Sequence, residues 1–498
     1  MKNISGWRYG IAGIITLFAF MLVTRWQTLP IFLDSYYHAA CMTGFRDAGG
    51  IVLHDFWEYA PAGRPHLYPP LFHIILLGLS KLGLPVLFII RAVSVAAYPL
   101  LLFIISWVVT KLYNDRCAFF TVLAASMPYT FFLNATAAIP STLALILLVL
   151  LFYAIETKRV LCGALLLGLA FYTHAGLSWI TVLIVILYAL FKIRDIKPIA
   201  LMISGGLLLG SPWSIYMLSK RSCFLPANSY INNYFEPNAL LYLFAIIGFL
   251  FVLKQRGRSL FYLAMIAGMM LMLKGYTFRF LCAEGLLPVI FLAGIGIDGS
   301  YSMAAGFLKK KNARAIVYSV FLPWLIFYLL TFWPGSSFKR FVHYDPDKAT
   351  ALESSIYFRN GMEELFSIIK ANTSPDEIIF CNYSYVGGIF YTFTGRVSSG
   401  AMLNEVMPAY PQDPFMPAAL IVWIKNPEGV FEPGLRANID RLGLVKAAET
   451  ELAYVYRNPV IMAHKKAARP VLPAGIALLL AFAWISAIFI CITKPHRI

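Results

Sequence analysis

The first long polar segment of this chain is rich in histidine. Four of its eight histidines fall within 36 residues, from His38 to His73, and charged side chains lie among them. Histidine and carboxylate groups exchange protons near neutral pH and bind divalent metals, so a cluster of both predicts a chemical site. The cluster consists of His38, His54, His66, His73, Asp34, Asp47, Asp55, Glu58, Arg46 and Arg64.

Asp34 is the most informative of these residues because it directly follows an apolar segment. A carboxylate at a membrane boundary is costly unless it has a partner, a catalytic purpose or access to water. In a helical conformation, Asp34 and His38 would share a face, as would His54 and Glu58. Either pair could then share a proton or a divalent metal such as Mg²⁺ or Mn²⁺, although histidine is also common in hydrated aromatic loops.

The composition places this cluster in a membrane protein. Of the 498 residues, 60% are apolar and 13% are charged, and the mean hydropathy is +0.72. Soluble proteins carry about 25% charged residues, so a soluble enzyme is excluded. The seven cysteines are scattered without CxxC spacing, which predicts neither a disulfide framework nor a zinc site.

The apolar stretches predict about twelve membrane crossings with both chain ends in the cytoplasm. This topology places 18 of the 27 basic residues outside 334–470 on the cytoplasmic side, provided that 69–82 is an interfacial helix. The net charge of +17 therefore requires no nucleic acid partner. The predicted crossings are residues 10–23, 87–110, 118–133, 141–155, 160–174, 177–191, 199–219, 240–253, 259–273, 281–297, 315–333 and 471–492.

This topology divides the chain into three parts. Residues 1–333 form a membrane domain, with a first outer loop at 27–68 and a second large outer loop at 220–239. The second loop is either a lid or an idle surface loop. Residues 334–470 form a small extracytoplasmic α/β domain, and residues 471–498 form a last crossing and a cytoplasmic tail.

The predicted α/β domain carries no nucleotide-binding fingerprint. Its basic and acidic residues are equal in number, 14 of each. The one GxGxxG pattern of the chain, at 294–299, lies at the end of a membrane helix with no strand before it, which indicates a packing role. The predicted elements are a helix at 353–370 and strands at 377–381, 419–424 and 453–456.

Nine basic residues stay on the outer side, against the positive-inside trend. Arg279 stands at the outer start of a membrane helix, where its guanidinium suits a phosphate at headgroup depth. The alternative is an arginine that extends to lipid headgroups. The nine residues are Arg25, Arg46, Arg64, Lys81, Arg91, Lys220, Arg221, Lys274 and Arg279.

The first outer loop also carries a family pattern. Residues 32–38 read Phe-Leu-Asp-Ser-Tyr-Tyr-His, Gly49 and Gly50 follow, and 58–73 read Glu-Tyr-Ala-Pro-Ala-Gly-Arg-Pro-His-Leu-Tyr-Pro-Pro-Leu-Phe-His. This pattern resembles the C-type membrane glycosyltransferases (the GT-C superfamily). That superfamily includes protein O-mannosyltransferases, aminoarabinose transferases of lipid A and oligosaccharyltransferase catalytic subunits. The resemblance implies a polytopic helical fold with a long first outer loop and an extracytoplasmic C-terminal domain.

The resemblance also implies roles for individual residues. Asp34 matches the catalytic acid, which acts as a base on the acceptor or helps to hold a divalent metal. Arg279 matches a basic position that meets the phosphate of a lipid-linked donor. Many members have a second acid after the third helix, but residues 134–141 contain no carboxylate. This departure favours metal-independent chemistry or other ligands. The candidate ligands are His38, His54 and Glu58.

These residues predict a membrane glycosyltransferase that uses a polyprenyl-phosphate sugar donor. A sugar leaving a lipid phosphate needs a carboxylate near the acceptor and cations near the developing phosphate charge. Asp34 supplies the first, and Arg279 with Lys274 or Arg221 supplies the second. We expect inversion at the anomeric carbon and a protein, lipid or glycan acceptor at the outer face of the plasma membrane. The other first-loop candidates are His38, His54, Glu58, Arg64, His66 and His73.

Two other classes of function compete with this hypothesis. A transporter, flippase or ligase of lipid-linked glycans would also need many helices and outward basic residues. Transporters usually place ionisable residues near the bilayer midplane, whereas nearly all charges of this chain lie in loops or at helix ends. A ligand sensor would leave the first-loop cluster unexplained. The absence of a Trp-Trp-Asp motif from 334–470 favours transfer of a single sugar over transfer of a whole glycan.

Overall fold

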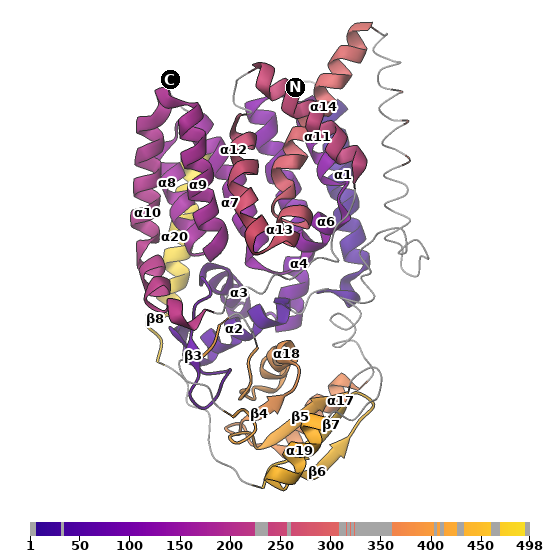
Figure 1. Cartoon of the computed structure of the whole chain (residues 1–498), viewed down its shortest axis with the longest axis vertical. Helices are drawn as coiled ribbons and strands as arrows, with labels where there is room; N and C mark the ends of the chain where they lie inside the picture. The colour runs from indigo at the N-terminus through magenta and orange to yellow at the C-terminus, as the bar shows by residue number, and fades with distance from the viewer. Residues whose placement is uncertain are drawn as a thin grey trace.

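A bundle of apolar helices stands on a smaller α/β domain, and a layer of two short helices and the first loop lies between them (Figure 1). This computed structural model describes only part of two predicted segments. Most of the crossing at 315–333 and residues 225–237 of the loop at 220–239 lie outside the described residues. The described residues are 6–30, 34–224, 238–255, 260–307, 361–402, 406–408, 413–425, 433–459 and 469–493, with the isolated positions 315, 319 and 323.

Helices occupy every predicted crossing between residues 10 and 297, and also the last one at 471–492. Within the described residues, five helices are long and apolar enough to cross a membrane, or six if α5 and α6 form one bent span. The total of twelve crossings stays a prediction. The helices are α1 Gly6–Thr24, α4 Val86–Leu112, α5 Asp115–Ala125, α6 Tyr129–Thr136, α7 Pro140–Glu156, α8 Val160–Phe171, α9 Ala175–Phe191, α10 Ile196–Ser219, α11 Ala239–Gln255, α12 Leu260–Met269, α13 Thr277–Cys282, α14 Leu286–Phe307 and α20 Ala474–Thr493.

The predicted crossing at 118–133 is formed by two helices, α5 and α6, which meet at an angle of 88°. Pro128 precedes α6 in an extended conformation, and the residue before a proline is disfavoured in the helical region. The proline therefore ends the first helix and redirects the chain.

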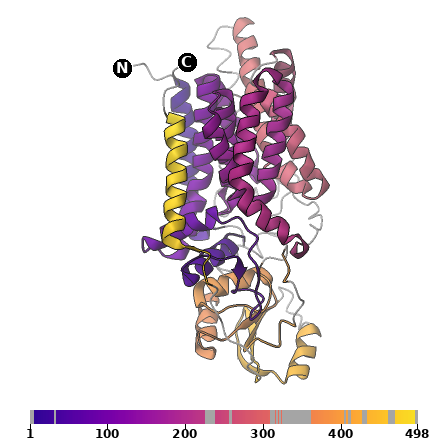
Figure 2. The ribbon, with the colours of Figure 1, turned by 90° about the vertical axis from the view of Figure 1, so that its left-hand side faces the viewer.

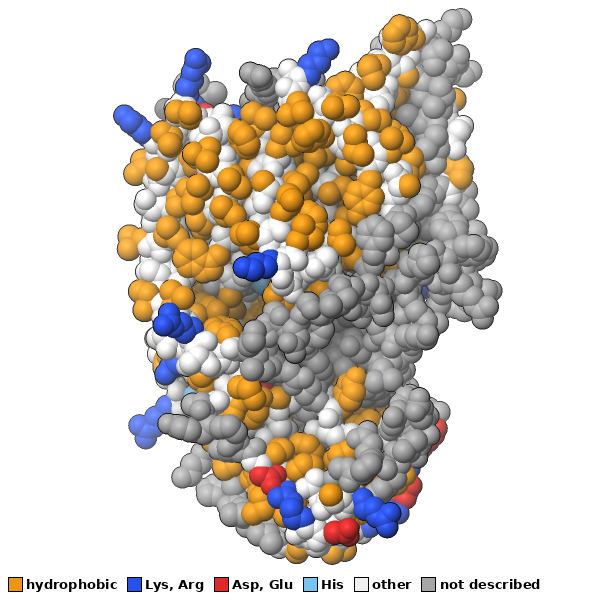
Figure 3. Space-filling model, viewed as in Figure 1, with side chains coloured by type: hydrophobic (Ala, Val, Ile, Leu, Met, Phe, Trp, Pro, Cys, Tyr) orange, Lys and Arg blue, Asp and Glu red, His pale blue; other side chains and the backbone are white. Residues whose placement is uncertain are grey.

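The two ends of the bundle differ in character. The start of α1 and the end of α20 lie at the end remote from the α/β domain (Figure 1). On the face shown in Figure 3, hydrophobic side chains cover a broad belt, Lys and Arg stand at that remote end, and acidic side chains gather on the α/β domain. An apolar belt between polar ends is the surface of an integral membrane protein.

The glycines of the GxGxxG pattern lie inside α14, which continues to Phe307, beyond the predicted end at residue 297. A Cβ on Gly296 would overlap the Phe244 carbonyl oxygen of α11, and one on Gly294 would overlap Thr121 of α5. The packing role expected from the sequence is thus confirmed.

The intermediate layer consists of α2 (Asp34–Ala48), α3 (Leu71–Lys81) and short strands. α2 is buried from Ser35 to Phe45. α3 has 11 residues, a length of about 16 Å, which is too short to cross a hydrocarbon core of about 30 Å. This length agrees with the predicted interfacial helix.

Two short strand pairs hold the first loop in place. β2 (His54–Asp55) pairs with β3 (Arg64–Pro65) within the loop. β1 (Gly50–Ile51) pairs with β8 (Leu472–Pro473), which leads directly into α20. Figure 2 shows α20 running along the bundle from this junction. The last helix of the chain is therefore anchored to the first loop.

The α/β domain contains a four-stranded mixed sheet in the order β4-β5-β7-β6. β4 and β5 are parallel, whereas β5 with β7 and β7 with β6 are antiparallel, and Ile421 lies opposite Tyr456. The three predicted strands are confirmed. β6 was missed because it is an exposed edge strand without the apolar pattern of a buried one. The strands are β4 Ile379–Cys381, β5 Leu420–Ile424, β6 Val445–Glu449 and β7 Ala453–Arg457.

Three helices flank this sheet. The helix predicted at 353–370 is confirmed in its second half as α17, while 353–360 lie outside the described residues. The other two helices were not predicted. The three are α17 Met362–Asn372, α18 Ser384–Thr394 and α19 Pro433–Leu442.

α2 and the α/β domain share one apolar core. Residues of α2, such as Tyr36 and Ala40, belong to the same buried cluster as Ile389 and Phe390 of α18. The Trp57 ring of the first loop stacks on Tyr391 with ring centroids 6.2 Å apart. The domain is therefore packed against the layer that holds the histidine cluster.

We predict that Gly44 of α2 is required for this packing. A Cβ at Gly44 would overlap the Trp57 ring, and overpacking of this kind costs about 1–3 kcal/mol. Gly44→Ala should therefore lower the melting temperature of the detergent-solubilised protein, although alanine favours helices. Gly13→Ala in α1 is the control, because no atom lies within 4 Å of its Cβ. Equal melting of both variants and the wild type would contradict this packing.

Candidate functional site

A cavity of about 230 Å³ lies where the first loop, the bundle and the α/β domain meet. Two arginines, Arg64 and Arg279, reach it from opposite parts of the chain, and none of its described lining residues is Asp or Glu. Such a cavity offers hydrogen-bond donors and positive charge to a ligand. Its lining is Tyr37, Arg64, Leu67, Tyr68, Pro69, His174, Ala175, Gly176, Leu177, Ile180, Met217, Phe224, Met272, Tyr276, Arg279 and Val406.

Arg64 is held by a buried ion pair. Its Nη2 donates to Glu58 Oε1 at 2.6 Å and to the Tyr37 hydroxyl at 3.2 Å, and both charged side chains are at most 1% exposed. Its Nη1 donates to the Val406 carbonyl at 3.2 Å, while Glu58 Oε2 accepts the Met402 N–H at 2.8 Å. Burial raises the pKa of Glu58, and the Arg64 guanidinium opposes that rise. The pair therefore connects the first loop, the α/β domain and the cavity.

The buried histidines lie behind this pair. His66 Nδ1 donates to Asp55 Oδ1 at 2.7 Å, and Asp55 Oδ2 lies 3.6 Å from Arg64. His38 Nδ1 and His73 Nε2 are 2.9 Å apart. Burial lowers the pKa of His38 to about 3, so its ring is neutral at pH 7. These histidines are buried and do not line the cavity.

Arg279 lies on the short helix α13, just before the chain turns into α14. Its Nη1 donates to Glu284 Oε1 at 2.9 Å, and Glu284 is fully buried. Its guanidinium also stands over the rings of Tyr276 and Phe278, with 5.6 and 5.7 Å to their centroids. The carboxylate and the rings hold the arginine in place while its side chain, 26% exposed, lines the cavity.

His174 completes this wall of the cavity as the N-cap of α9. Its Nδ1 accepts the Leu177 N–H at 3.3 Å, a hydrogen bond that satisfies one of the free donors of the first turn. Because Nδ1 accepts a hydrogen bond it carries no proton, so the ring is neutral in this arrangement.

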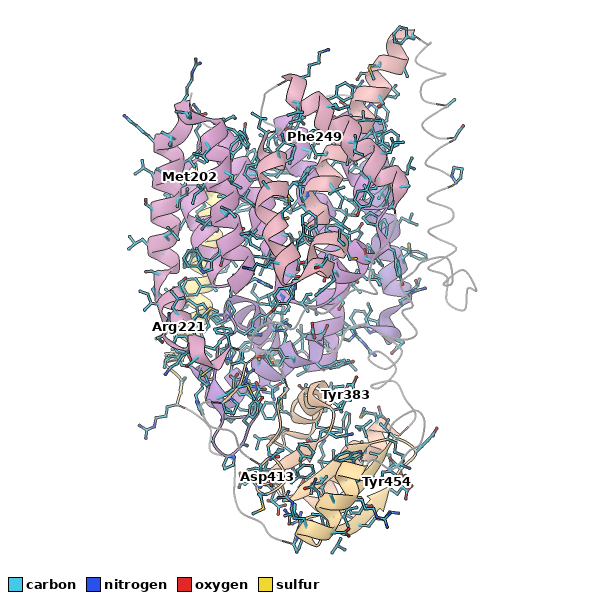
Figure 4. The ribbon with its side chains drawn as sticks, viewed as in Figure 1. Met202, Arg221, Phe249, Tyr383, Asp413 and Tyr454 are labelled. Atoms are coloured by element: carbon cyan, nitrogen blue, oxygen red, sulfur yellow. The ribbon has the colours of Figure 1, made fainter. Side chains whose placement is uncertain are left out.

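The structure brings together only part of the predicted site. Arg279, predicted to meet the donor phosphate, lines the cavity together with Arg64. Lys274, at the end of the 3₁₀ helix Met270–Lys274, and Arg221, in the 3₁₀ helix Arg221–Cys223, are exposed and do not line it. Arg221 lies at the end of the bundle nearest the α/β domain (Figure 4).

Asp34 is the first residue of α2 and is exposed. It is absent from the cavity lining, but Tyr37, three residues later on the same helix, is part of it. Residues three apart on a helix lie on one face. Asp34 therefore stands one helical turn from the cavity.

The expected pairing of His54 with Glu58 is wrong. The segment forms β2 and a turn instead of a helix, so the two side chains do not share a helical face. His54 is exposed and its Nε2 lies 2.6 Å from the Ala62 carbonyl oxygen, whereas Glu58 is buried against Arg64. Local strand pairing prevailed over the helical spacing.

The donor groups do not fit a metal at Asp34 and His38. These two residues do share α2, as predicted, but His38 is 2% exposed and its Nδ1 is occupied by His73. Among the residues that the structure describes, no group of three or more His, Cys, Asp or Glu side chains is arranged to hold a metal ion.

Several cavity residues were not predicted from the sequence. His174 and Val406 come from segments that carry no motif, and Tyr37 lies within the 32–38 pattern without having been singled out. Glu284, the partner of Arg279 outside the cavity lining, lies inside an apolar stretch. An acid in such a stretch is a signal, because it needs a partner. Its partner, Arg279, is five residues away, so the pair could have been expected.

No protein-family model and no curated protein sequence matches the chain. Its structure is similar to ArnT from Cupriavidus metallidurans, an aminoarabinose transferase, with a TM-score of 0.52 and 14% identity over 90% of this chain and 98% of that one. A structure of ArnT bound to undecaprenyl phosphate gives the same values.

The chain is also similar to the archaeal oligosaccharyltransferase AglB from Archaeoglobus fulgidus in complex with an inhibitory peptide and a dolichol-phosphate. The TM-score is 0.54, with 11% identity over 84% of this chain and 69% of that one. An Archaeoglobus fulgidus oligosaccharyltransferase in complex with Zn and sulfate matches with a TM-score of 0.52 and 10% identity, over 82% of this chain and 68% of that one.

These likenesses cover both the helical bundle and the α/β domain. Both ArnT and AglB are GT-C glycosyltransferases. The chain therefore has the fold of the GT-C membrane glycosyltransferases, as the first-loop pattern implied.

We predict that the Glu58–Arg64 pair stabilises the junction strongly. Removing one partner of a buried pair leaves a charge uncompensated and costs about 3–5 kcal/mol. Glu58→Gln should therefore lower the melting temperature by many degrees. The matched control is Glu449→Gln, which removes a carboxylate paired with Lys425 and Lys446 at the surface and should cost at most about 1 kcal/mol. Equal losses in the two variants would contradict the structural role of the buried pair.

Proposed function

We propose that this protein is a membrane glycosyltransferase that transfers a sugar from a polyprenyl-phosphate donor to an acceptor at the outer face of the plasma membrane. The observation that carries the proposal is the arginine-lined cavity at the junction of bundle, first loop and α/β domain. The GT-C fold supports it, since ArnT with this fold was solved bound to undecaprenyl phosphate and AglB with a dolichol-phosphate.

The cavity suits the departure of a sugar from a lipid phosphate. When the bond between the anomeric carbon and the phosphate oxygen breaks, its electron pair and negative charge move onto the phosphate. Fixed cations stabilise this charge without reorganisation. Arg279 and Arg64 supply such cations, and their carboxylate partners Glu284 and Glu58 are fully buried behind them. Arg64 takes the role that we expected of Lys274 or Arg221.

Asp34 is proposed as the base that accepts the proton of the acceptor hydroxyl. It stands one turn from Tyr37, a distance of about 4.5 Å along the helix axis, and so beside the cavity. Its position at the first turn of α2 favours the ionised carboxylate, because the positive end of the helix dipole faces it. Attack from the side opposite the phosphate would invert the anomeric carbon.

The acceptor of the proposed transferase is a protein, a lipid or a glycan. The alternative function is a transporter, flippase or ligase of lipid-linked glycans. The position of the charges favours the transferase. Arg64 and Arg279 are each held by a buried carboxylate, and catalysis needs cations that are held rigidly. The α/β domain forms part of the cavity wall through Val406. A flippase has no need for such a wall.

We predict that Asp34→Asn abolishes transfer. Loss of a general base lowers rates by about 10²- to 10⁴-fold. The measurement is transfer of radiolabelled sugar from a panel of polyprenyl-phosphate donors by membranes that contain each variant, with and without a chelator. Asp413→Asn is the control, because Asp413 is a surface residue of the α/β domain that pairs with Arg441 (Figure 4). Its activity should match the wild type.

The outcomes separate the alternatives. Activity retained by Asp34→Asn would remove Asp34 as the base. Loss of activity with the chelator would show a metal requirement that the described donor groups do not explain. A wild type that moves lipid-linked glycans across vesicles, but transfers no sugar from any donor, would favour the transporter.

A further inference from the structure

His174 differs from the other cavity residues because its hydrogen-bonding pattern is fixed by the backbone. The Leu177 N–H can only donate, so His174 Nδ1 must be the acceptor of the 3.3 Å hydrogen bond. In a neutral imidazole, one ring nitrogen accepts and the other carries the proton. The proton of His174 therefore resides on Nε2, and the ring offers a donor on the side away from α9.

The surroundings of His174 select for an anion. Arg279 is close enough to act electrostatically on the ring, and both residues line the cavity with Arg64. Ala175 and Gly176, also in the lining, are the first residues of α9, where backbone N–H groups lack intrahelical acceptors and the helix dipole favours negative charge.

Arg64 has a hydrogen-bond donor that its protein partners do not use. The residue is 1% exposed, and its Nε has no hydrogen-bond acceptor among the described residues. A buried donor without an acceptor costs about 1–3 kcal/mol. The Nε atom itself exposes less than 1 Å², so Arg64, which lines the cavity, acts on a ligand there chiefly through its charge. A phosphate has enough oxygens to serve Arg64, Arg279 and His174 together.

We propose that His174 is a neutral hydrogen-bond donor to the phosphate of the lipid donor, and that its N-cap bond to Leu177 keeps Nε2 in the donating form. This inference rests on the proposed function. It makes His174 a binding residue for the phosphate, in addition to its structural role in starting α9. The ring contributes a directed hydrogen bond without adding a third positive charge, so the phosphate is held while its release after transfer is still possible.

The capping role and the binding role can be separated by substitution. Asn and Asp are about equally good N-cap residues, so both His174→Asn and His174→Asp should keep the cap of α9. The nearby Arg279 charge and the helix dipole favour Asp at this position, so His174→Asp should be at least as stable as His174→Asn without ligand. Asn also offers an N–H donor, whereas Asp places a negative charge beside the phosphate. His174→Ala loses both the cap and the donor.

The experiment measures binding of farnesyl phosphate to the full-length protein in detergent, with farnesol and inorganic phosphate as comparison ligands. His174→Asn should bind farnesyl phosphate within about threefold of the wild type. His174→Ala should bind about tenfold more weakly, and His174→Asp at least about 100-fold more weakly, as expected for hydrogen bonds to a charged group. Farnesol should bind poorly because it lacks the phosphate, and inorganic phosphate should bind more weakly because it lacks the chain.

Each result has a distinct meaning. Equal binding by the Asn and Asp variants would show that His174 only caps α9, and would overturn the inference. Arg279→Gln separates this failure from a failure of the proposed function: if it weakens binding while the Asp variant does not, the phosphate site stands without His174. A wild type that binds farnesol as well as farnesyl phosphate would overturn both proposals. Binding of inorganic phosphate as tight as that of farnesyl phosphate would overturn the assignment to a lipid phosphate.

Discussion

The buried ion pair of Glu58 and Arg64 is the interaction on which the rest of the site depends. Two charges removed from water are costly, and only excellent geometry with further hydrogen bonds compensates for that cost. Here the remaining donors and acceptors come from two other parts of the chain. Met402 and Val406 belong to the α/β domain and Tyr37 belongs to α2, whereas the pair itself belongs to the first loop. Displacing α2 or the α/β domain would leave the buried pair without hydrogen bonds that compensate for its removal from water.

This constraint explains how segments distant in the sequence build one cavity. The Val406 N–H and carbonyl lie in a segment that bridges to Phe224 at the end of the bundle, and the Met407 N–H donates to the Cys223 carbonyl at 2.8 Å. The Ala60 N–H donates to the Ser398 carbonyl at 2.9 Å on the other side of the pair. The α/β domain is therefore a structural part of the cavity wall. Glu58 and Glu284 are fully buried and do not line the cavity, whereas their partners Arg64 and Arg279 do. The cavity is therefore suited to an anion.

Much of the fold could be predicted from the sequence because its causes are local. Membrane helices follow from runs of apolar residues, and the buried strands β4, β5 and β7 follow from short apolar runs between turns. The first loop is a candidate site because its histidines and acids are close together in the sequence, and Arg279 is a candidate because it precedes an apolar helix. These signals require no knowledge of which segments meet.

What could not be predicted depends on distant contacts. Nothing near His174 in the sequence shows that it lies close to Arg279. Lys274 and Arg221 have the same charge and the same predicted outer position as Arg279, but they do not line the cavity. The helical pairing of His54 with Glu58 failed because Glu58 pairs with Arg64 across a turn, and the break between α5 and α6 depended on one proline. The positions of His174, Lys274 and Arg221 relative to the cavity were decided by tertiary packing, whereas the β2–β3 turn and the proline break are local features that the helical pattern did not reveal.

The most direct test of the account is a cryo-electron microscopy structure of the protein in lipid nanodiscs with undecaprenyl phosphate. The account predicts density for the phosphate in the cavity, in contact with Arg279, Arg64 and His174, and with Asp34 facing the same space. Phosphate density at another place on the protein, with this cavity free of ligand, would contradict it.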